Sequence, residues 1–306
     1  MTLPKIAIMG AGAVGCYYGA ELALAGLPVT LIGRPALVQA VAERGLILEK
    51  AGRQISVPLA ASADPAAVAG AKIVIVAVKS GDSAEAARQI APHLAPDATI
   101  LSFQNGISNP EVLSAALNRP VIAAVVYVAT DMAGPGHVRH HGRGELILAP
   151  GPGAEEAAAT MRGAGITVEV SDQARVAQWV KFTINCAFNA PSALTRQPYG
   201  IIAAQPGAYA MMADIIAEVR AVAEAAGIAL PGNLMQMAEG IATQMQAQYS
   251  STAQDMMRGR KTEIDYLNGE VLRRAEALGI PAPVNRALWV MVKLAETAQS
   301  SSQTSS

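Results

Sequence analysis

The chain has 306 residues, and its 23 Lys and Arg against 24 Asp and Glu give a formal net charge of −1. This balance lacks the basic surface that nucleic acid or an anionic membrane would attract, so we expect neither as a partner. A hydrophobic fraction of 52% with only 15% charged residues argues against a disordered chain, and the length favours about two domains.

Strands and helices alternate over the first half of the chain. Residues 72–78 read Lys-Ile-Val-Ile-Val-Ala-Val, as expected of a strand buried on both faces of a sheet. Lys50-Ala51-Gly52 predicts the turn of a hairpin between two further strands. The other expected strands cover residues 5–9, 29–32, 99–103 and 121–129, and the first two are followed by helices over residues 16–25 and 35–44. This alternation predicts an α/β domain with a Rossmann-type, doubly wound parallel sheet over residues 1–171.

Glycines divide residues 131–150 into two short strands, which we expect to form an antiparallel hairpin. His137, His140 and His141 cluster there, and histidine is a frequent metal ligand. The alternation of a strand points His140 and His141 to opposite faces, and we expect no carboxylate or cysteine to join them. They are therefore interpreted as structural residues, with no metal site.

Strand signals nearly vanish after Asp172. Helices are expected over residues 173–188, 207–226, 233–248, 262–278 and 283–298. They predict a C-terminal all-α domain for substrate and catalysis over residues 172–298, followed by a disordered tail over residues 299–306. The Met-rich, apolar helices could bury the surface of a homodimer or pack internally.

Neither cysteine spacing nor hydropathy suggests an exported or membrane protein. Cys16 and Cys186 lie far apart and form neither a disulfide framework nor a zinc motif. The longest uncharged stretches are interrupted by Gly or Pro before they reach the length of a membrane span. We therefore expect a cytoplasmic protein.

A glycine motif, Gly10-x-Gly12-x-x-Gly15, follows the first strand and opens the first helix. In that context it predicts a dinucleotide-binding loop rather than a glycine-rich turn without a ligand. Gly10 would permit the tight turn, Gly12 the approach of a pyrophosphate, and Gly15 the close packing of helix on strand. The expected cofactor loop consists of Gly10, Ala11, Gly12, Ala13, Val14 and Gly15.

The end of the second strand bears on the choice of cofactor. It reads Leu31-Ile32-Gly33-Arg34 and lacks the carboxylate that NAD-binding sites usually direct at the ribose 2′-hydroxyl. Arg34 could pair with a 2′-phosphate, so we predict NADP(H). The alternative is that Arg34 is a solvated residue at the start of a helix.

Lys181, Asn185 and Asn189 are spaced i, i+4 and i+8, so they share one face of a helix that is otherwise apolar. A buried ammonium group and two buried amides are costly unless they have partners, so this face predicts a polar ligand or a cleft between domains. The alternative is a lysine that extends to solvent beside helix-capping asparagines.

Two further polar residues follow strands at the carboxyl edge of the predicted sheet, where ligands bind in open α/β folds. Lys79 could meet the charge of a cofactor or substrate, or extend into water. Asn105 could hydrogen-bond a nicotinamide or a substrate oxygen, or belong to an Asn-Gly turn.

Together these features resemble the ketopantoate reductase (2-dehydropantoate 2-reductase) family over residues 5–298. The most specific match is the run at residues 260–269, Arg-Lys-Thr-Glu-Ile-Asp-Tyr-Leu-Asn-Gly. The other matches are the glycine loop, Val78-Lys79, Gln104-Asn105-Gly106, Lys181-x-x-x-Asn185-Cys186-x-x-Asn189, and Ser250-Ser251 before Gln254-Asp255. The resemblance implies NADPH-dependent reduction of 2-dehydropantoate to pantoate, on the route to pantothenate and coenzyme A.

The resemblance also implies roles for individual residues. Lys181 is expected to donate the proton to the ketone, because a cation stabilises charge that develops on the carbonyl oxygen, and arginine could not give up a proton. Glu263 is expected to contact the cofactor near the nicotinamide and to support this lysine, although alone it would be taken for a surface carboxylate. The other implied contacts are Asn185, Asn189 and Ser251 to the substrate, Ala129 to the cofactor, and Lys79 and Asn105 to the cleft that holds both.

Two departures from the family pattern concern the substrate. Gln248 stands where the best-known members carry Asn, and Tyr199 replaces a polar contact residue. An NADPH-dependent reductase of another 2-oxo acid is therefore a second hypothesis. A third is a non-catalytic NADP(H)-binding sensor, which would have no use for Lys181 or Glu263.

Overall fold

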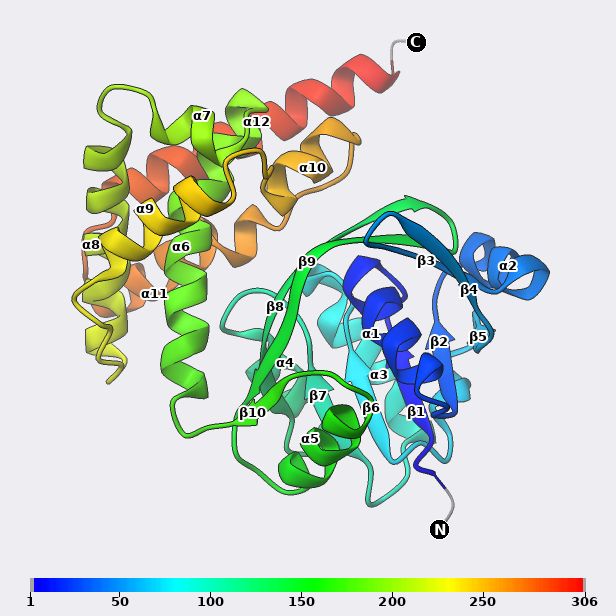
Figure 1. Cartoon of the computed structure of the whole chain (residues 1–306). Helices are drawn as coiled ribbons and strands as arrows, with labels where there is room; N and C mark the ends of the chain where they lie inside the picture. Colours follow the sequence, from blue (N-terminus) through cyan, green and yellow to red (C-terminus); the bar gives the residue numbers. More distant parts are fainter. Residues whose placement is uncertain (1–2, 305–306) are drawn as a thin grey trace. The chain divides into compact units, whose positions relative to one another are not determined.

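A sheet of ten strands forms the centre of the N-terminal part of the chain (Figure 1). The computed structural model describes residues 3–304, and the described residues form two compact units that meet between Arg175 and Val176. The strands of the first unit are β1 Ile6–Met9, β2 Val29–Ile32, β3 Leu46–Lys50, β4 Arg53–Val57, β5 Ala60–Ser62, β6 Ile73–Val76, β7 Thr99–Ser102, β8 Ile122–Gly134, β9 His137–Leu148 and β10 Val168–Val170. Its helices are α1 Ala13–Leu24, α2 Pro35–Arg44, α3 Ser83–Ile90, α4 Asn109–Leu117 and α5 Ala154–Gly163, with short 3-10 helices η1 Pro65–Val68, η2 Ser80–Asp82 and η3 Ala91–His93.

The strand order is β4-β3-β9-β8-β7-β6-β1-β2-β5, and β10 pairs with β9. Strands β5, β2, β1, β6, β7 and the start of β8 are parallel, which confirms the predicted doubly wound sheet. The chain passes from β1 to β2 on one side and later returns to β6 on the other side of β1. The carboxyl ends of β1 and β6 therefore form the topological switch point, the position at which open α/β sheets bind ligands.

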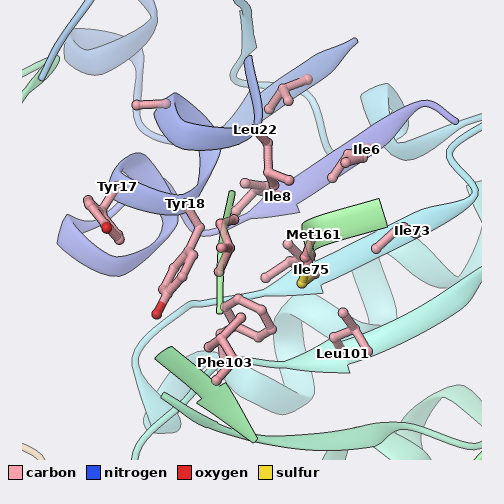
Figure 2. Close-up of a cluster of buried hydrophobic side chains, with 14 of the residues drawn as sticks. Ile6, Ile8, Tyr17, Tyr18, Leu22, Ile73, Ile75, Leu101, Phe103 and Met161 are labelled. Carbon is pink, nitrogen blue, oxygen red and sulfur yellow. The ribbon is translucent and has the colours of Figure 1, made fainter. Parts of the chain in front are cut away.

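Successive side chains of β1 point to opposite faces of the sheet, and a separate hydrophobic core covers each face at this strand. Ile6 and Ile8 of β1 pack with Tyr18 and Leu22 of α1, and Figure 2 shows them beside residues of β6 and β7 and Met161 of α5. The alternate residues of β1 pack in a separate core with side chains of α3 and α4, including Ile90 and Leu113. This two-sided burial fixes the positions of the loops at the carboxyl edge.

The expected hairpin is longer than the sequence indicated. Strand β8 begins parallel to β7 and then continues as the antiparallel partner of β9. Gly142 and Gly144 do not end a strand, because both adopt a φ of +147° within β9, where the register to β8 shifts. Such shifts bend a strand pair without ending it, so glycine here marks bulges rather than turns.

The described part of the second unit contains helices and no strand, as the sequence predicted. The helices are α6 Ala174–Thr195, α7 Tyr199–Ala203, α8 Ala208–Ala225, α9 Leu234–Gln244, α10 Ser251–Met257, α11 Asn268–Leu278 and α12 Pro283–Thr304, with a 3-10 turn η4 Ile264–Tyr266. None of the helices in residues 3–304 combines the length and apolar character needed to span a bilayer.

Several boundaries in this unit differ from expectation, and the helix expected over residues 233–248 ends at Gln244. Helix α6 continues past residue 188 with Pro191 inside it, and the helix expected from residue 262 begins only at Asn268. Helix α12 extends to Thr304 over most of the expected tail, and residues 305–306 lie outside the described residues. Composition alone does not reveal that a polar segment can continue a helix already nucleated by apolar turns.

Candidate functional site

The glycine loop connects β1 to α1, and each of its three glycines meets a different constraint. Gly10 has a φ of +107°, and a Cβ there would lie 2.5 Å from the backbone of Ala77. A Cβ on Gly15 would lie 2.2 Å from the Gly10 carbonyl oxygen, whereas a Cβ on Gly12 would meet no atom of the described chain within 4 Å. Gly10 and Gly15 are therefore required by the fold, while Gly12 keeps an open space beside the backbone.

This open space lies at the N-terminus of α1. The Gly12 carbonyl accepts the first helical hydrogen bond from Cys16, at 2.8 Å, so the amides of Ala13, Val14 and Gly15 precede the helical ladder. Free amides and the helix dipole together attract an anion such as a pyrophosphate. The loop thus fits the phosphate groups of a dinucleotide.

Arg34 follows β2 beside this loop. The amides of Gly10 and Ala11 donate to the carbonyl of Ile32, at 3.0 and 3.1 Å, and a Cβ on Gly33 would lie 2.8 Å from the Ala11 Cβ. Arg34 is exposed at the N-cap position of α2. The backbone that carries the Arg34 side chain is therefore held against the phosphate loop.

Lys79 and Asn105 lie at the same sheet edge, after β6 and β7. Lys79 is exposed at the start of η2, and Asn105 is half-buried. A group of buried polar side chains joins their two loops, which the local sequence pattern does not indicate: Ser80, Ser83, Ser102, Gln104 and Asn109. Ser83 and Asn109 are the first residues of α3 and α4, and Gln104 lies in the loop after β7.

Ala129 lies in β8, opposite Gly142 and between two shifts in register to β9. It is half-buried. The contact of Ala129 with a cofactor stays a prediction.

In the second unit, α6 carries the polar face that the helical spacing predicted. Phe182 and Phe188, on its other faces, are buried, whereas Lys181 and Asn185 are half-buried. Asn189 is buried, donates from Nδ2 to Thr252 Oγ1 at 3.2 Å, and leaves its buried Oδ1 without a hydrogen-bond partner. An unsatisfied buried amide oxygen is costly, and a donor group on a ligand or a water would satisfy it.

Helix α10, which is absent from the helices expected from the sequence, lies against this polar face. Ser250 caps α10 by accepting from the Ala253 amide at 2.9 Å, and its own amide donates to Ser192 Oγ of α6 at 3.3 Å. Ser251, the first residue of α10, is exposed. The structure thus brings Asn189 into contact with Thr252, the neighbour of Ser251, across a junction of two helices.

Glu263 lies just before the turn η4 and not within a helix, contrary to the expectation for residues 262–278. Helix α12 holds its loop, because Glu296 accepts from the Thr262 amide at 2.7 Å. Asn268, after the turn, donates to the Cys186 carbonyl of α6 at 3.2 Å. The Glu263 loop is thereby tied to α6 next to Asn185.

The three clustered histidines have separate partners. His137 Nε2 lies 3.1 Å from Glu49, His140 stacks on the ring of Tyr17 at 4.5 Å, and His141 Nε2 lies 2.7 Å from Asp131. Carboxylates from β3 and β8 therefore do join two of them, contrary to the expectation from the sequence. No group of three or more His, Cys, Asp or Glu within residues 3–304 is placed to hold a metal ion.

Asp131 should make the first unit sensitive to acid. Burial raises the pKa of Asp131, but hydrogen bonds from Arg139 and His141 outweigh burial and lower it to about 2. A lowered pKa stabilises the folded state above the ordinary pKa of about 4, and this contribution is lost as the pH falls toward 2. Asp131→Asn should therefore cost about 2 kcal/mol at pH 7 and progressively less between pH 4 and 2.

Chemical unfolding of wild type and Asp131→Asn at several pH values measures this difference. Asp97→Asn, which removes an exposed partner of Lys72, is the control and should change little. A stability difference that does not narrow in acid would contradict the role given to Asp131.

Models of one protein family match the sequence of both units. The family model described as "Ketopantoate reductase PanE/ApbA" matches residues 6–153, and its C-terminal counterpart matches residues 173–296. The 2-dehydropantoate 2-reductase of Pyrococcus horikoshii is 31% identical, covering 96% of this chain and 98% of that protein. The enzyme of the same name from Halobacterium salinarum is 32% identical, covering 95% and 99%.

Solved structures of related proteins also match nearly the whole chain. A PanE/ApbA family ketopantoate reductase from Ralstonia eutropha is 51% identical, with a TM-score of 0.93 over 97% of this chain and 99% of that one. A D-mandelate dehydrogenase, in a ternary structure with NADH and anilino(oxo)acetate, is 25% identical with a TM-score of 0.92 and the same coverage.

Proposed function

The chain belongs to the ketopantoate reductase family, and we propose that it reduces the ketone of 2-dehydropantoate to the hydroxyl of pantoate with NADPH. The observation that carries this proposal is the full-length similarity to enzymes named 2-dehydropantoate 2-reductase. The polar face of α6 and the glycine loop supply the two kinds of group that such a reaction needs.

The glycine loop would hold the cofactor's pyrophosphate, because the space beside Gly12 and the amides that follow it fit an anion. Arg34 would pair with the 2′-phosphate, and Lys79 and Asn105 would contact the cofactor and substrate at the switch point. Bound NADPH would supply the hydride. Ala129 and Glu263 complete the proposed cofactor contacts.

Lys181 is the proposed proton donor. As the ketone carbon becomes tetrahedral, negative charge develops on its oxygen, and an ammonium group at hydrogen-bond distance stabilises that charge. The ammonium group then transfers its proton to this oxygen, which becomes the product hydroxyl. Glu263 would support the lysine, acting from a loop that Asn268 ties to α6.

Asn185, Asn189 and Ser251 would hold the substrate. The unpartnered Oδ1 of Asn189 can accept from a substrate hydroxyl, and the exposed hydroxyl of Ser251 can donate to a carboxylate. These three groups carry no charge that would compete with Lys181. They therefore fit a small hydroxylated 2-oxo acid.

A reductase of another 2-oxo acid is the second candidate, and the similarity to the D-mandelate dehydrogenase structure favours it. Tyr199 packs against Phe188 with ring centroids 4.7 Å apart, so aromatic surface lies beside the helix that bears Asn189. A panel of 2-oxo acids that includes ketopantoate and benzoylformate, compared by kcat/KM, decides between the candidates. Ketopantoate should rank among the best substrates, and a clear preference for an aromatic acid would overturn the narrower proposal.

Arg34→Ala should reduce the preference for NADPH over NADH. Removal of a charge-assisted pair with a phosphate costs about 1.5–3 kcal/mol, or roughly 10- to 100-fold in binding, while NADH binding should change little. Fluorescence titration of both nucleotides on wild type and variant measures the preference. Arg44→Ala, near the C-terminus of the same helix α2, is a matched control. An unchanged preference in Arg34→Ala would remove this residue from the cofactor site.

The cytoplasmic location stays a prediction, and so does the alternative between a homodimer surface and internal packing for the Met-rich helices.

A further inference from the structure

A chain of buried side-chain hydrogen bonds connects the two loops that carry Lys79 and Asn105. Ser102 Oγ donates to Gln104 Oε1 at 3.0 Å, and Gln104 Nε2 donates to Ser83 Oγ at 2.6 Å. Ser83 Oγ donates to Asn109 Oδ1 at 2.9 Å, and Asn109 Nδ2 donates to Ser80 Oγ at 3.0 Å. This series of hydrogen bonds therefore runs from the end of β7 through the start of α3 to the start of α4, and back to the loop after β6.

Two backbone carbonyls fix the direction of these hydrogen bonds. Gln104 Nε2 also donates to the Val78 carbonyl at 3.0 Å, and Asn109 Nδ2 also donates to the Asn105 carbonyl at 2.6 Å. Because a carbonyl can only accept, both amide groups must turn their NH₂ ends toward the loops. Each NH₂ group then makes two hydrogen bonds, and the hydroxyls of Ser102 and Ser83 donate in the same sense.

Among these hydrogen-bonded residues, Asn109 is the one whose side chain bonds to both loops directly. It holds Ser80, the neighbour of Lys79, and it holds the backbone of Asn105 itself. Its side chain is 1% exposed, so water does not substitute for these partners. Lys79 is held from its other side as well, because Gln104 binds the carbonyl of Val78.

We propose that Asn109 is a positioning residue that holds the Lys79 and Asn105 loops in the arrangement that binds the cofactor. The inference rests on the proposed function for the identity of the ligand, but its structural part does not. Asn109 touches neither cofactor nor substrate in this proposal. It acts by keeping two contact residues from moving independently at the edge of the sheet, where loops otherwise have the greatest freedom.

Three variants separate the two connections. Asn109→Ala removes both, and Ser80→Ala removes only the connection to the Lys79 loop. In Asn109→Asp the hydroxyls of Ser80 and Ser83 can turn and donate to the carboxylate, whereas the Asn105 carbonyl cannot donate, so only the Asn105 connection is lost. Ser114→Ala is the control, because Ser114 lies on the same helix α4 and bonds the Arg119 carbonyl at 2.6 Å, away from both loops.

Amide hydrogen exchange of the cofactor-free protein measures directly how strongly the backbone of each loop is protected. Asn109→Ala should speed exchange in residues 77–84 and 103–109, Ser80→Ala only in the first segment, and Asn109→Asp only in the second. Exchange in the glycine loop should stay as in wild type. Uniformly faster exchange throughout the first unit would mean a merely structural role and would overturn the proposal.

Nucleotide binding supplies the second measurement. Asn109→Ala should weaken NADPH binding about tenfold and raise the KM for NADPH, while Ser114→Ala binds as wild type. Wild-type affinity in Asn109→Ala would overturn the positioning role. If wild type binds NADPH but reduces no 2-oxo acid, the proposed substrate fails, and weaker binding by Asn109→Ala still supports positioning. If wild type binds neither nucleotide, both proposals fail.

Discussion

Replacing Lys181 by alanine should lower kcat by about 10²- to 10⁴-fold, the usual contribution of a general acid, and leave the Kd for NADPH nearly unchanged. The reason is that its ammonium group acts on charge that develops only in the transition state. Steady-state kinetics with ketopantoate, together with fluorescence titration of NADPH, separates the two effects. This split between rate and cofactor binding also distinguishes a reductase from a nucleotide sensor.

Lys181→Arg is the informative companion variant. It keeps the positive charge but cannot give up a proton, so it should recover little of the lost rate. Lys72→Ala, which removes an exposed lysine of the first unit, should behave as wild type. An unchanged kcat in Lys181→Ala would exclude this residue as the proton donor.

Gly15→Ala should lower the stability of the fold, whereas Gly12→Ala should lower the affinity for NADPH, although the two glycines belong to one motif. At Gly15 the new Cβ would lie 2.2 Å from the Gly10 carbonyl oxygen, so the helix must move away from the loop. Such overpacking costs about 1–3 kcal/mol or more, and we expect a clear loss of stability. Gly12 has a φ of −86°, which alanine adopts without strain, and no described atom within 4 Å of the new Cβ.

Gly12→Ala should therefore fold as wild type, with a stability change within about 1 kcal/mol. It should nevertheless weaken NADPH binding about tenfold or more, because the methyl group occupies the space proposed for the pyrophosphate. Thermal melting and nucleotide titration of both variants test the pair. Wild-type NADPH affinity in Gly12→Ala would show that the cofactor does not approach this backbone.

Local patterns were sufficient for the parts of the fold that depend on neighbouring residues. The glycine motif between a strand and a helix predicted the loop at β1 and α1, and the alternation of elements predicted a parallel sheet and a helical second unit. The spacing of Lys181, Asn185 and Asn189 predicted a polar face on a buried helix. In each case a backbone period of two or 3.6 residues places the side chains, so the sequence alone carries the information.

Local patterns were misleading where the same residue type occurs both in turns and within helices or strands. Gly142 and Gly144 indicated a turn but lie within β9, because pairing with β8 continues through the register shifts. Thr262 and Glu263 looked helical, yet the Glu296 side chain binds the Thr262 amide and holds this segment as a loop. Tertiary hydrogen bonds override weak local preference in both places.

The amino-acid sequence by itself determined which chemical groups this protein has and on which kind of element each one lies. Only the tertiary structure decided their neighbours: Asn189 meets Thr252 across 63 residues of chain, and Ser83 meets Asn109 across 26. The physical reason is that side-chain periodicity is a property of adjacent residues, whereas a hydrogen bond between distant segments depends on how the whole chain closes around its cores.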